Sequence, residues 1–95
     1  MPYAIVNEFE GGTKEQYEAA VEVVHPADGL PPGQTHHYAG PSPTGWVVVA
    51  IWDSNESWDS FRDQTLLPGL GGLGDSGFPG PPRTAEFEVE VDVSR

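Results

Sequence analysis

The sequence predicts an α+β fold, in which two helices cover one face of a four-stranded antiparallel sheet. Three observations carry this prediction. Some segments alternate apolar and polar residues, others repeat apolar residues at helical spacing, and glycine or proline clusters separate them. The resulting order of strand, helix, strand, strand, helix and strand is the ferredoxin-like βαββαβ arrangement. We expect a single domain over residues 1–95, because a chain of this length forms one modest core.

The N-terminal part predicts a strand followed by a capped helix. Residues 3–9 (YAIVNEF) are rich in aromatic and β-branched side chains and end at a glycine pair, as strands do. Thr13 and Gln16 then form a capping-box pattern, with the hydroxyl at the N-cap and the amide three residues later. The helix ends at His25, before a proline. Its buried face is expected to carry the apolar side chains Tyr17, Ala20, Val21 and Val24.

The middle of the chain predicts a hairpin. Residues 26–33 (PADGLPPG) form a turn-rich connector, and residues 34–40 (QTHHYAG) form the second strand. An irregular loop (GPSPTG) follows, and residues 45–53 (GWVVVAIWD) form a third strand that is apolar on both faces. We take the face with Val47, Val49 and Ile51 as the one that the helices cover.

The C-terminal part predicts a helix, a long loop and a strand. Ser54 caps the helix, whose apolar positions are Trp58, Phe61 and Leu66. Residues 68–82 (PGLGGLGDSGFPGPP) are expected to form a structureless loop that packs through Leu70, Leu73 and Phe78. Residues 84–93 alternate strictly, which predicts a last strand with one buried and one solvated face. Its acidic row is interpreted as the solvated face rather than a calcium site: Glu86, Glu88, Glu90 and Asp92.

The charge of the chain excludes several classes of partner. Fifteen acidic residues against four basic ones give a net charge of −11. Nucleic acids and anionic membranes need a cationic protein surface, which four scattered cations do not form. The absence of cysteine excludes disulfides and thiolate metal sites. No apolar run reaches membrane-spanning length and the N-terminus has no signal-peptide pattern, so we expect a cytoplasmic protein.

The third strand also predicts a partner. Two helices cover only one face of the sheet, yet this strand is apolar on both sides, so its other face needs a cover. A second copy of the chain is the natural one. We therefore expect a homodimer formed through the sheet faces.

A short stretch then indicates a family. Residues 51–54 (IWDS), running into residues 56–61 (ESWDSF), resemble the dimeric α+β barrel superfamily and in particular its antibiotic-biosynthesis-monooxygenase-like members. The order of elements resembles this group over nearly the whole chain. The resemblance implies a dimer, a pocket between helices and sheet, and oxidation of electron-rich aromatic polyketides without metal or flavin. We accordingly expect no cofactor.

Some members of that group degrade haem, and the resemblance allows this activity to be tested by residue. Those members carry an asparagine on the first strand, a tryptophan or histidine on the second helix, and a later histidine that ligates iron. Asn7 matches the first position, but Phe61 occupies the second and no histidine follows His37. The haem-degrading interpretation therefore fails.

The candidate site centres on the adjacent pair His36 and His37. Neighbouring side chains on a strand point to opposite faces, so only one of them can enter a pocket, and we favour His37 with Val49 as its hairpin partner. That histidine would act as a base, with Tyr38 or Asn7 as the oxyanion partner, because imidazole titrates near neutral pH. The alternatives are a purely structural pair or a metal site. No metal-ligand spacing is present, so we expect no metal.

The aromatic residues suggest a ligand site, whereas the glycine runs do not. Trp58 and Phe61 are the candidate ligand-binding residues, although core and interface packing also explain the three tryptophans. The glycine runs lack the lysine and the strand-to-helix context of phosphate loops. Two functions remain open: a cofactor-independent monooxygenase or isomerase that acts on a small apolar or aromatic molecule, and a non-catalytic module that binds such a ligand or supports a pathway.

Overall fold

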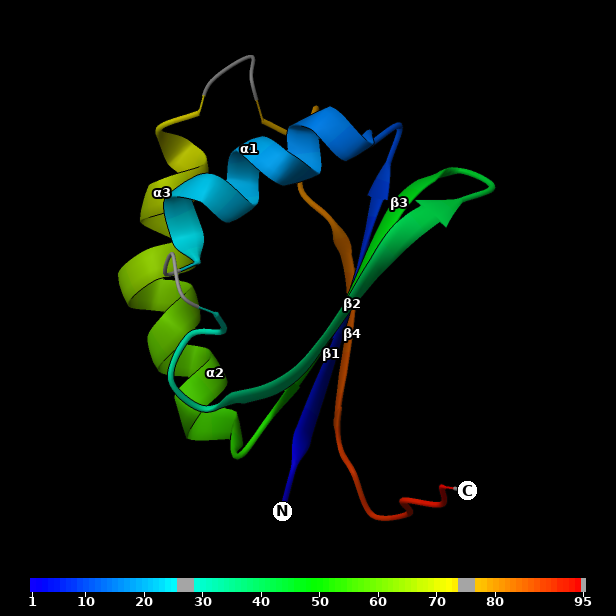
Figure 1. Ribbon diagram of the computed structural model, residues 1–95, viewed down its shortest axis with the longest axis vertical. Coiled ribbons are helices and arrows are strands. Elements are labelled where there is room, and N and C mark those ends of the chain that lie inside the picture. Colours follow the sequence, from blue (N-terminus) through cyan, green and yellow to red (C-terminus); the bar gives the residue numbers. More distant parts are fainter. Residues whose placement is uncertain (26–28, 74–76, 95) are drawn as a thin grey trace.

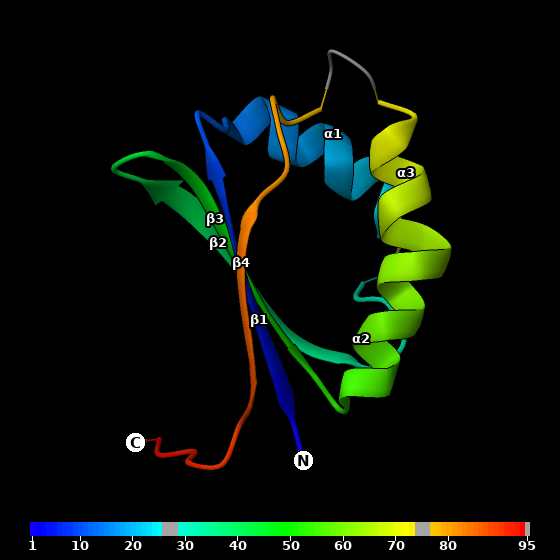
Figure 2. The ribbon, with the colours of Figure 1, turned by 180° about the vertical axis from the view of Figure 1, so that it is seen from behind.

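A computed structural model of the chain describes residues 1–25, 29–73 and 77–94 and shows four strands in one antiparallel sheet. The strands are β1 (Tyr3–Glu10), β2 (Gln34–Ser42), β3 (Gly45–Trp52) and β4 (Arg83–Glu88), in the order β2-β3-β1-β4. The helices are α1 (Lys14–Val24), α2 (Asn55–Phe61), the π-helix η1 (Arg62–Leu66) and α3 (Leu67–Gly71). All of them lie on one side of the sheet (Figures 1 and 2). The predicted ferredoxin-like α+β fold is confirmed.

Helix α1 begins and ends where the sequence predicts. The Thr13 hydroxyl accepts a hydrogen bond from the Gln16 backbone N–H at 3.2 Å, and the Gln16 side chain accepts one from the Thr13 N–H at 2.9 Å. This capping box satisfies two backbone donors that a helix start leaves without partners. At the other end, His25 adopts an extended conformation and closes the helix. Residues 26–28 of the predicted connector lie outside the described residues.

The second helical segment is longer than predicted. The structureless loop expected from Pro68 is wrong in its first part, because the chain continues from α2 through η1 into α3 and ends at Gly71. In η1 the Leu67 N–H bonds the Arg62 carbonyl, five residues earlier. A proline ring collides with the carbonyl four residues before it in a regular helix, and this widened turn ahead of Pro68 relieves the conflict. Residues 74–76 of the predicted loop lie outside the described part of the chain.

The β2–β3 hairpin is tighter than predicted. Both strands extend into the expected GPSPTG loop, which leaves only Pro43 and Thr44 between them. The Ser42 hydroxyl accepts a hydrogen bond from the Gly45 N–H at 3.1 Å and so closes the turn. A side chain at position 45 would collide with the Phe9 carbonyl oxygen, which explains the glycine there. The pairing of β2 with β3 shifts register between Gln34 and His36.

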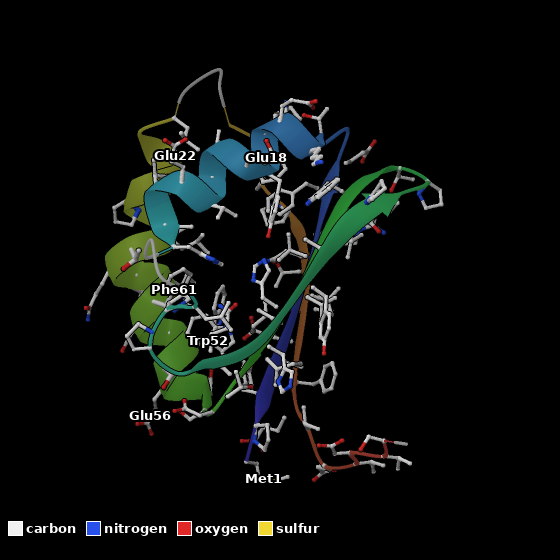
Figure 3. All side chains as sticks on the ribbon, viewed as in Figure 1. Met1, Glu18, Glu22, Trp52, Glu56 and Phe61 are labelled. Carbon is white, nitrogen blue, oxygen red and sulfur yellow. The ribbon has the colours of Figure 1, made fainter. Side chains whose placement is uncertain are left out.

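The helix-covered face of β3 differs from the expected one. Trp46, Ala50 and Trp52 on this face are buried, and the face with Val47, Val49 and Ile51 is the one that no helix covers. The expectation was wrong because a strand that is apolar on both sides carries no alternation to distinguish them. The buried core beneath the helices consists of Tyr3, Ile5, Ala50, Trp52 and Trp58. Figure 3 shows Trp52 and Phe61 between the layers, with Glu18, Glu22 and Glu56 pointing outward.

Strand β4 ends earlier than predicted and has no buried side within the chain. It stops at Glu88, which pairs with Tyr3 at the start of β1. The Val89 N–H still donates to the Pro2 carbonyl at 2.8 Å, and residues 90–93 belong to no strand among the described residues. All six residues of β4 are exposed, and Phe87 is 53% exposed. The apolar row of β4 belongs to the uncovered side of the sheet, here named the open face, with these residues: Ala4, Val6, His36, Tyr38, Val47, Val49, Ile51, Ala85 and Phe87.

Candidate functional site

A cavity of about 280 Å³ lies between the sheet and the helices. Its wall is mostly apolar and includes side chains from the four helical segments and all four strands. The aromatic part of the wall consists of Phe9, Tyr17, Trp52, Trp58, Phe61 and Phe78. A cavity of this kind, apolar with a few convergent polar groups, is the usual form of a small-molecule site.

The π-helix shapes one side of this cavity. Residues five apart lie nearly above one another in a π turn, whereas they diverge in an α-helix. Phe61 and Leu66 have this spacing, and both line the cavity. The side chains of Leu67 and Leu70 in α3 extend the same wall. The widened turn thus converts an irregular apolar pattern into one continuous surface.

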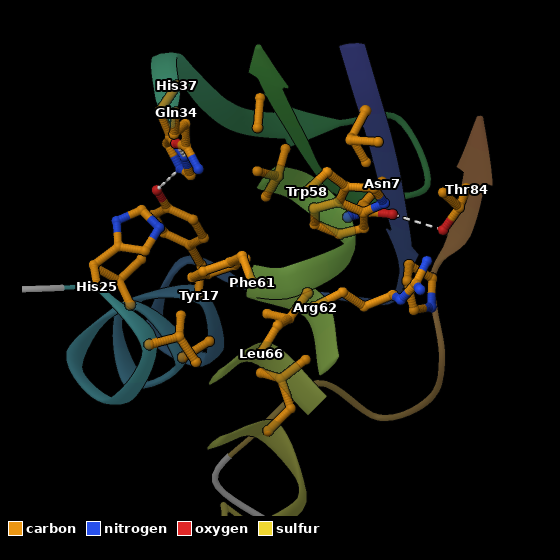
Figure 4. Close-up of a pocket in the computed structure, with 18 of the residues that line it drawn as sticks. Asn7, Tyr17, His25, Gln34, His37, Trp58, Phe61, Arg62, Leu66 and Thr84 are labelled. Atoms are coloured by element: carbon orange, nitrogen blue, oxygen red, sulfur yellow. Dashed lines mark hydrogen bonds between the residues drawn. The ribbon is translucent and has the colours of Figure 1, made fainter. Parts of the chain in front are cut away.

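One end of the cavity carries a chain of hydrogen bonds across three residues. The Tyr17 hydroxyl lies 2.6 Å from Nε2 of His37, and Nδ1 of His37 lies 2.8 Å from Oε1 of Gln34 (Figure 4). An amide oxygen only accepts, so Nδ1 of His37 carries the proton. Its Nε2 is therefore the acceptor, and Tyr17 donates to it. Gln34 is buried, with 8% of its surface exposed, so its side chain holds this series of hydrogen bonds in position.

The environment keeps these groups uncharged near neutral pH. Burial, together with the nearby His25, lowers the pKa of His37 to about 4. Burial also lowers the pKa of His25, whose ring lies edge-on to His37 with centroids 4.8 Å apart. Burial raises the pKa of the Tyr17 hydroxyl. In each case the apolar surroundings disfavour the charged form.

The opposite end of the cavity holds a second polar pair. Thr84 on β4 donates a hydrogen bond to Oδ1 of Asn7 on β1 at 2.6 Å. Figure 4 shows this pair across the cavity from His37, with Trp58 and Phe61 between the two ends. The Asn7 amide group keeps its two N–H donors for another partner.

Two further polar groups lie along the wall. The indole N–H of Trp58 is buried and has no hydrogen-bond partner among the described residues, as is also true of Trp46 and Trp52. Arg62 lies with its guanidinium carbon 6.0 Å from the centre of the Trp58 ring. It forms ion pairs with Asp59 at 3.2 Å and Asp63 at 3.0 Å. The Trp58 N–H is therefore an unpaired donor inside the packed wall, whereas Arg62 already has two anionic partners.

The structure separates the sequence-predicted residues into two groups. His37, Asn7, Trp58 and Phe61 all line the cavity. His36 and Tyr38 do not, because they lie on the open face, where their rings stack at 6.2 Å and both side chains are exposed. Tyr38 and His36 are therefore not brought together with Asn7.

The register of His37 also differs from the expected one. Its partner on β3 is Ala50 rather than Val49. Ala50 lies on the helix-covered face, so His37 enters the cavity although both steps that led there, the partner and the covered face, were wrong. The bulge between Gln34 and His36 and the two-residue turn set this register, and neither is visible in the apolar pattern.

Sequence reasoning missed several polar residues of the cavity. Tyr17 was expected only as an apolar position of its helix, but a hydroxyl on a buried face needs a partner, and this was the available signal. Gln34 and Thr84 gave no signal, because each is one of several polar residues in its strand. Arg62 gave no signal either, because it lies next to the predicted apolar position Phe61 and not on the predicted buried face itself. Among the described residues, no group of three or more histidine, aspartate and glutamate side chains is arranged to hold a metal ion.

Several solved structures are similar to this chain over nearly its full length. The Rv0793 protein from Mycobacterium tuberculosis has a TM-score of 0.72 and 15% identity, over 99% of this chain and 100% of that one. A putative antibiotic biosynthesis monooxygenase from Chloroflexus aurantiacus J-10-fl has a TM-score of 0.66 and 16% identity, over 99% and 98%. A protein of unknown function from Nitrosomonas europaea has a TM-score of 0.67 and 13% identity, over 99% and 94%.

These likenesses support the family resemblance at the level of fold. The chain has the ferredoxin-like fold of antibiotic-biosynthesis-monooxygenase-like structures over nearly its full length. No family model matches the sequence, and no curated protein matches it. No helix in the described part of the chain is long and apolar enough to cross a membrane.

Proposed function

We propose that this protein binds a small apolar or aromatic molecule in the cavity and acts on it as a cofactor-independent monooxygenase or isomerase. The observation that carries the proposal is an apolar cavity with uncharged hydrogen-bonding groups at its two ends. Such a site desolvates a ring system and fixes its orientation through a few polar contacts.

His37 and Asn7 have the main roles in this proposal. Nε2 of His37 is a hydrogen-bond acceptor and serves as the base through the Tyr17 hydroxyl, which takes a proton from the ligand as it passes its own proton to His37. The Asn7 amide donates to an oxygen on which negative charge develops. Trp58 and Phe61 contact the ring from the α2 side of the cavity wall. His36 and Tyr38 have no part, because they lie on the open face.

The likeness to a structure named as a putative antibiotic biosynthesis monooxygenase supports the oxidative form of the proposal. Without a cofactor, the substrate itself supplies the electrons that reduce O₂. Loss of a proton from an activated methylene group gives a carbanion that reacts with O₂. The methylene becomes a carbonyl, and the second oxygen atom leaves as water. An isomerase would use the same first step and return the proton at another carbon.

One observation favours the alternative, a non-catalytic ligand-binding module. His37 has a pKa of about 4, and both of its ring nitrogens already have hydrogen-bond partners. An efficient general base has a pKa near the working pH, and a base this weak removes a proton only from an acidic ligand. A protein that only binds its ligand does not need His37 to have a pKa near the working pH.

We also propose that the protein is a homodimer in which the open faces of two sheets pack together. The support is the row of valine, isoleucine and phenylalanine side chains that no helix covers. A small acidic domain keeps such a surface only where a partner buries it.

The experiment that tests the proposed function has two stages. A panel of aromatic molecules with one to three rings is screened by protein-observed NMR, and ligands that shift resonances of Ile5 and Val48 in the cavity wall are kept. Each is then incubated with the protein, with dissolved oxygen and the ligand's ultraviolet spectrum followed. Oxygen uptake that His37→Gln abolishes and His36→Gln retains supports the monooxygenase, and a spectral change without oxygen uptake supports the isomerase. Binding without either supports the module, and no cavity ligand at all contradicts every form of the proposal.

A further inference from the structure

We infer that the cavity selects a neutral two-ring molecule with a hydroxyl group at one end and a carbonyl group at the other. The hydroxyl donates a hydrogen bond to the Tyr17 oxygen, and the carbonyl accepts one from the Asn7 amide. The inference rests on the proposed function, because it names the ligand class of the same cavity.

The size of the cavity sets the number of rings. A cavity of roughly 150 Å³ in an apolar core binds a single benzene ring. The present cavity, at about 280 Å³, is about twice that volume. Two fused rings therefore fill it, whereas one ring leaves much of the wall without contacts.

The Tyr17 end accepts hydrogen bonds. The buried Gln34 amide oxygen places the proton of His37 on Nδ1, so Nε2 takes the Tyr17 hydroxyl proton. A hydroxyl group whose only proton is already donated in one hydrogen bond can still accept another through its oxygen. His37 itself has no free ring nitrogen. The Tyr17 oxygen is therefore the group that this chain presents to the ligand, and it calls for a donor such as a hydroxyl.

The opposite end donates hydrogen bonds. Thr84 uses its proton on Oδ1 of Asn7, which leaves the Asn7 amide N–H groups facing the cavity end. An amide donor that faces an apolar cavity is costly to leave without a partner, so a ligand acceptor placed here is favoured. A carbonyl oxygen is such an acceptor.

The two ends are far enough apart for one molecule to span them. Asn7 pairs with Val48 on β3, while His37 pairs with Ala50, so the two residues lie two strands and two residues apart. Strand spacing and rise then place their Cα atoms about 12 Å apart. The side chains of His37 and Asn7 both extend into the cavity from these positions, so the gap that a ligand spans is shorter than the Cα separation. The rings of Trp58 and Phe61 line one side of the path between the ends.

The charges around the cavity exclude an ionised ligand. Arg62 is the only cation among the described lining residues, and Asp59 and Asp63 already neutralise it. A carboxylate or phenolate would lose its water shell without gaining a cationic partner. The net charge of −11 opposes its approach as well. A cation would meet the amide donors of Asn7, which repel it.

The test compares three neutral probes of nearly the same size: 6-hydroxy-1-tetralone, 6-methoxy-1-tetralone and 5,6,7,8-tetrahydro-2-naphthol. The first carries both groups, the second cannot donate, and the third has no carbonyl. Affinities are measured by NMR titration at about pH 6, where a phenolic hydroxyl keeps its proton. We expect the hydroxyketone to bind about tenfold more tightly than either of the others, the effect of one well-placed hydrogen bond.

Two variants assign the contacts, and a third serves as a control. In Tyr17→Phe, we expect the preference for the hydroxyketone over the methoxyketone to fall below about twofold. The affinity for the methoxyketone should stay the same, which would show that the cavity is intact. In Tyr38→Phe, on the open face, the preference is unchanged. In Asn7→Leu, the preference for the hydroxyketone over the naphthol is lost. An undiminished preference in Tyr17→Phe overturns the hydroxyl assignment, and one in Asn7→Leu overturns the carbonyl assignment.

The outcomes also separate this inference from the proposed function. If the three probes bind equally, or if only other aromatic molecules shift the Ile5 and Val48 resonances, the inferred ligand class is wrong and the proposed function stands. If no aromatic molecule shifts them, the proposed function fails together with the inference.

Discussion

His36 and His37 are adjacent in the chain but lie on opposite faces of the sheet. His37 lies under α1 with its Nε2 2.6 Å from the Tyr17 hydroxyl, and His36 is exposed on the open face beside Tyr38. The same side chain at neighbouring positions therefore experiences two environments, one partly desolvated and one solvated. The pair provides a matched experiment on what the cavity does to an imidazole.

We predict that acidification destabilises the fold through His37. In the unfolded chain its imidazole takes up a proton near pH 6.5, but in the folded state it does so only at about pH 4. Between these values the unfolded state binds more protons, so stability falls as the pH drops through this window and the effect is complete below it. The groups that face the ring are Tyr17, Gln34 and His25, and His25 adds to the effect because burial lowers its pKa as well.

Urea unfolding at the two ends of this window measures the effect. His37→Gln should lose less stability on acidification than the parent protein, whereas His36→Gln should lose as much as the parent. The carboxylates of this acidic chain contribute equally to all three proteins, so the differences between them isolate the histidine. An identical pH dependence in the parent and in His37→Gln would show that the ring is not desolvated as described.

A second prediction concerns the amide that orients His37. Gln34 is buried, and its oxygen is the partner of the His37 Nδ1–H. Gln34→Leu keeps the volume but leaves that N–H without an acceptor, so we expect a loss of about 1–3 kcal/mol in the free energy of unfolding. Thr35→Val, at the next position, removes only solvent-exposed hydrogen bonds of the Thr35 hydroxyl, to the Ile51 carbonyl and the His36 ring, and should cost no more than about 0.5 kcal/mol. Chemical denaturation at neutral pH compares the two, and equal effects would contradict the hydrogen-bond chain.

The sequence is sufficient to predict the element order, and it is insufficient to predict which face of β3 the helices cover. Capping residues, the helical period of α1 and the glycine–proline clusters are local signals, and the elements they predict are present. The covered face of β3 and the register of His37 depend on a bulge and on a two-residue turn. These are properties of strand pairing, and a strand such as 45–52, apolar on both sides, does not report them.

The second helical segment shows the same limit. A proline and four glycines after Leu67 predict a loop, yet the chain remains helical to Gly71. The five-residue spacing of Phe61 and Leu66 fits neither an α-helix nor a strand, and the π turn that explains it is too rare to assume. The cavity wall formed by Leu66, Leu67 and Leu70 was therefore beyond what the pattern alone could predict.

A third prediction uses two glycines of α3 as a matched pair. A Cβ on Gly69 would lie 2.7 Å from Cγ1 of the buried Val24, whereas one on Gly71 would meet nothing within 4 Å. We expect Gly69→Ala to destabilise the fold by about 1–3 kcal/mol, because it forces α1 and α3 apart. Gly71→Ala should be neutral or stabilise it by up to about 1 kcal/mol through helix propensity. Thermal unfolding of both variants measures the difference, and equal values would mean that the two helices do not pack this closely.

The last prediction tests the proposed dimer at the centre of the open face. Val49 lies between Val6 on β1 and Tyr38 on β2, so packing of two open faces buries it, and an ammonium group there would be desolvated without a partner. Dimers of ordinary size bury about 1,200–2,000 Å² in total. We therefore expect Val49→Lys to convert the dimer to a 10.2 kDa monomer in sedimentation equilibrium at micromolar concentration. Val23→Lys makes the same change on the outer side of α1, where the side chain is 48% exposed, and should leave the dimer intact. A parent protein that sediments as a monomer refutes the dimer, and a Val49→Lys variant that remains dimeric places the interface on another surface.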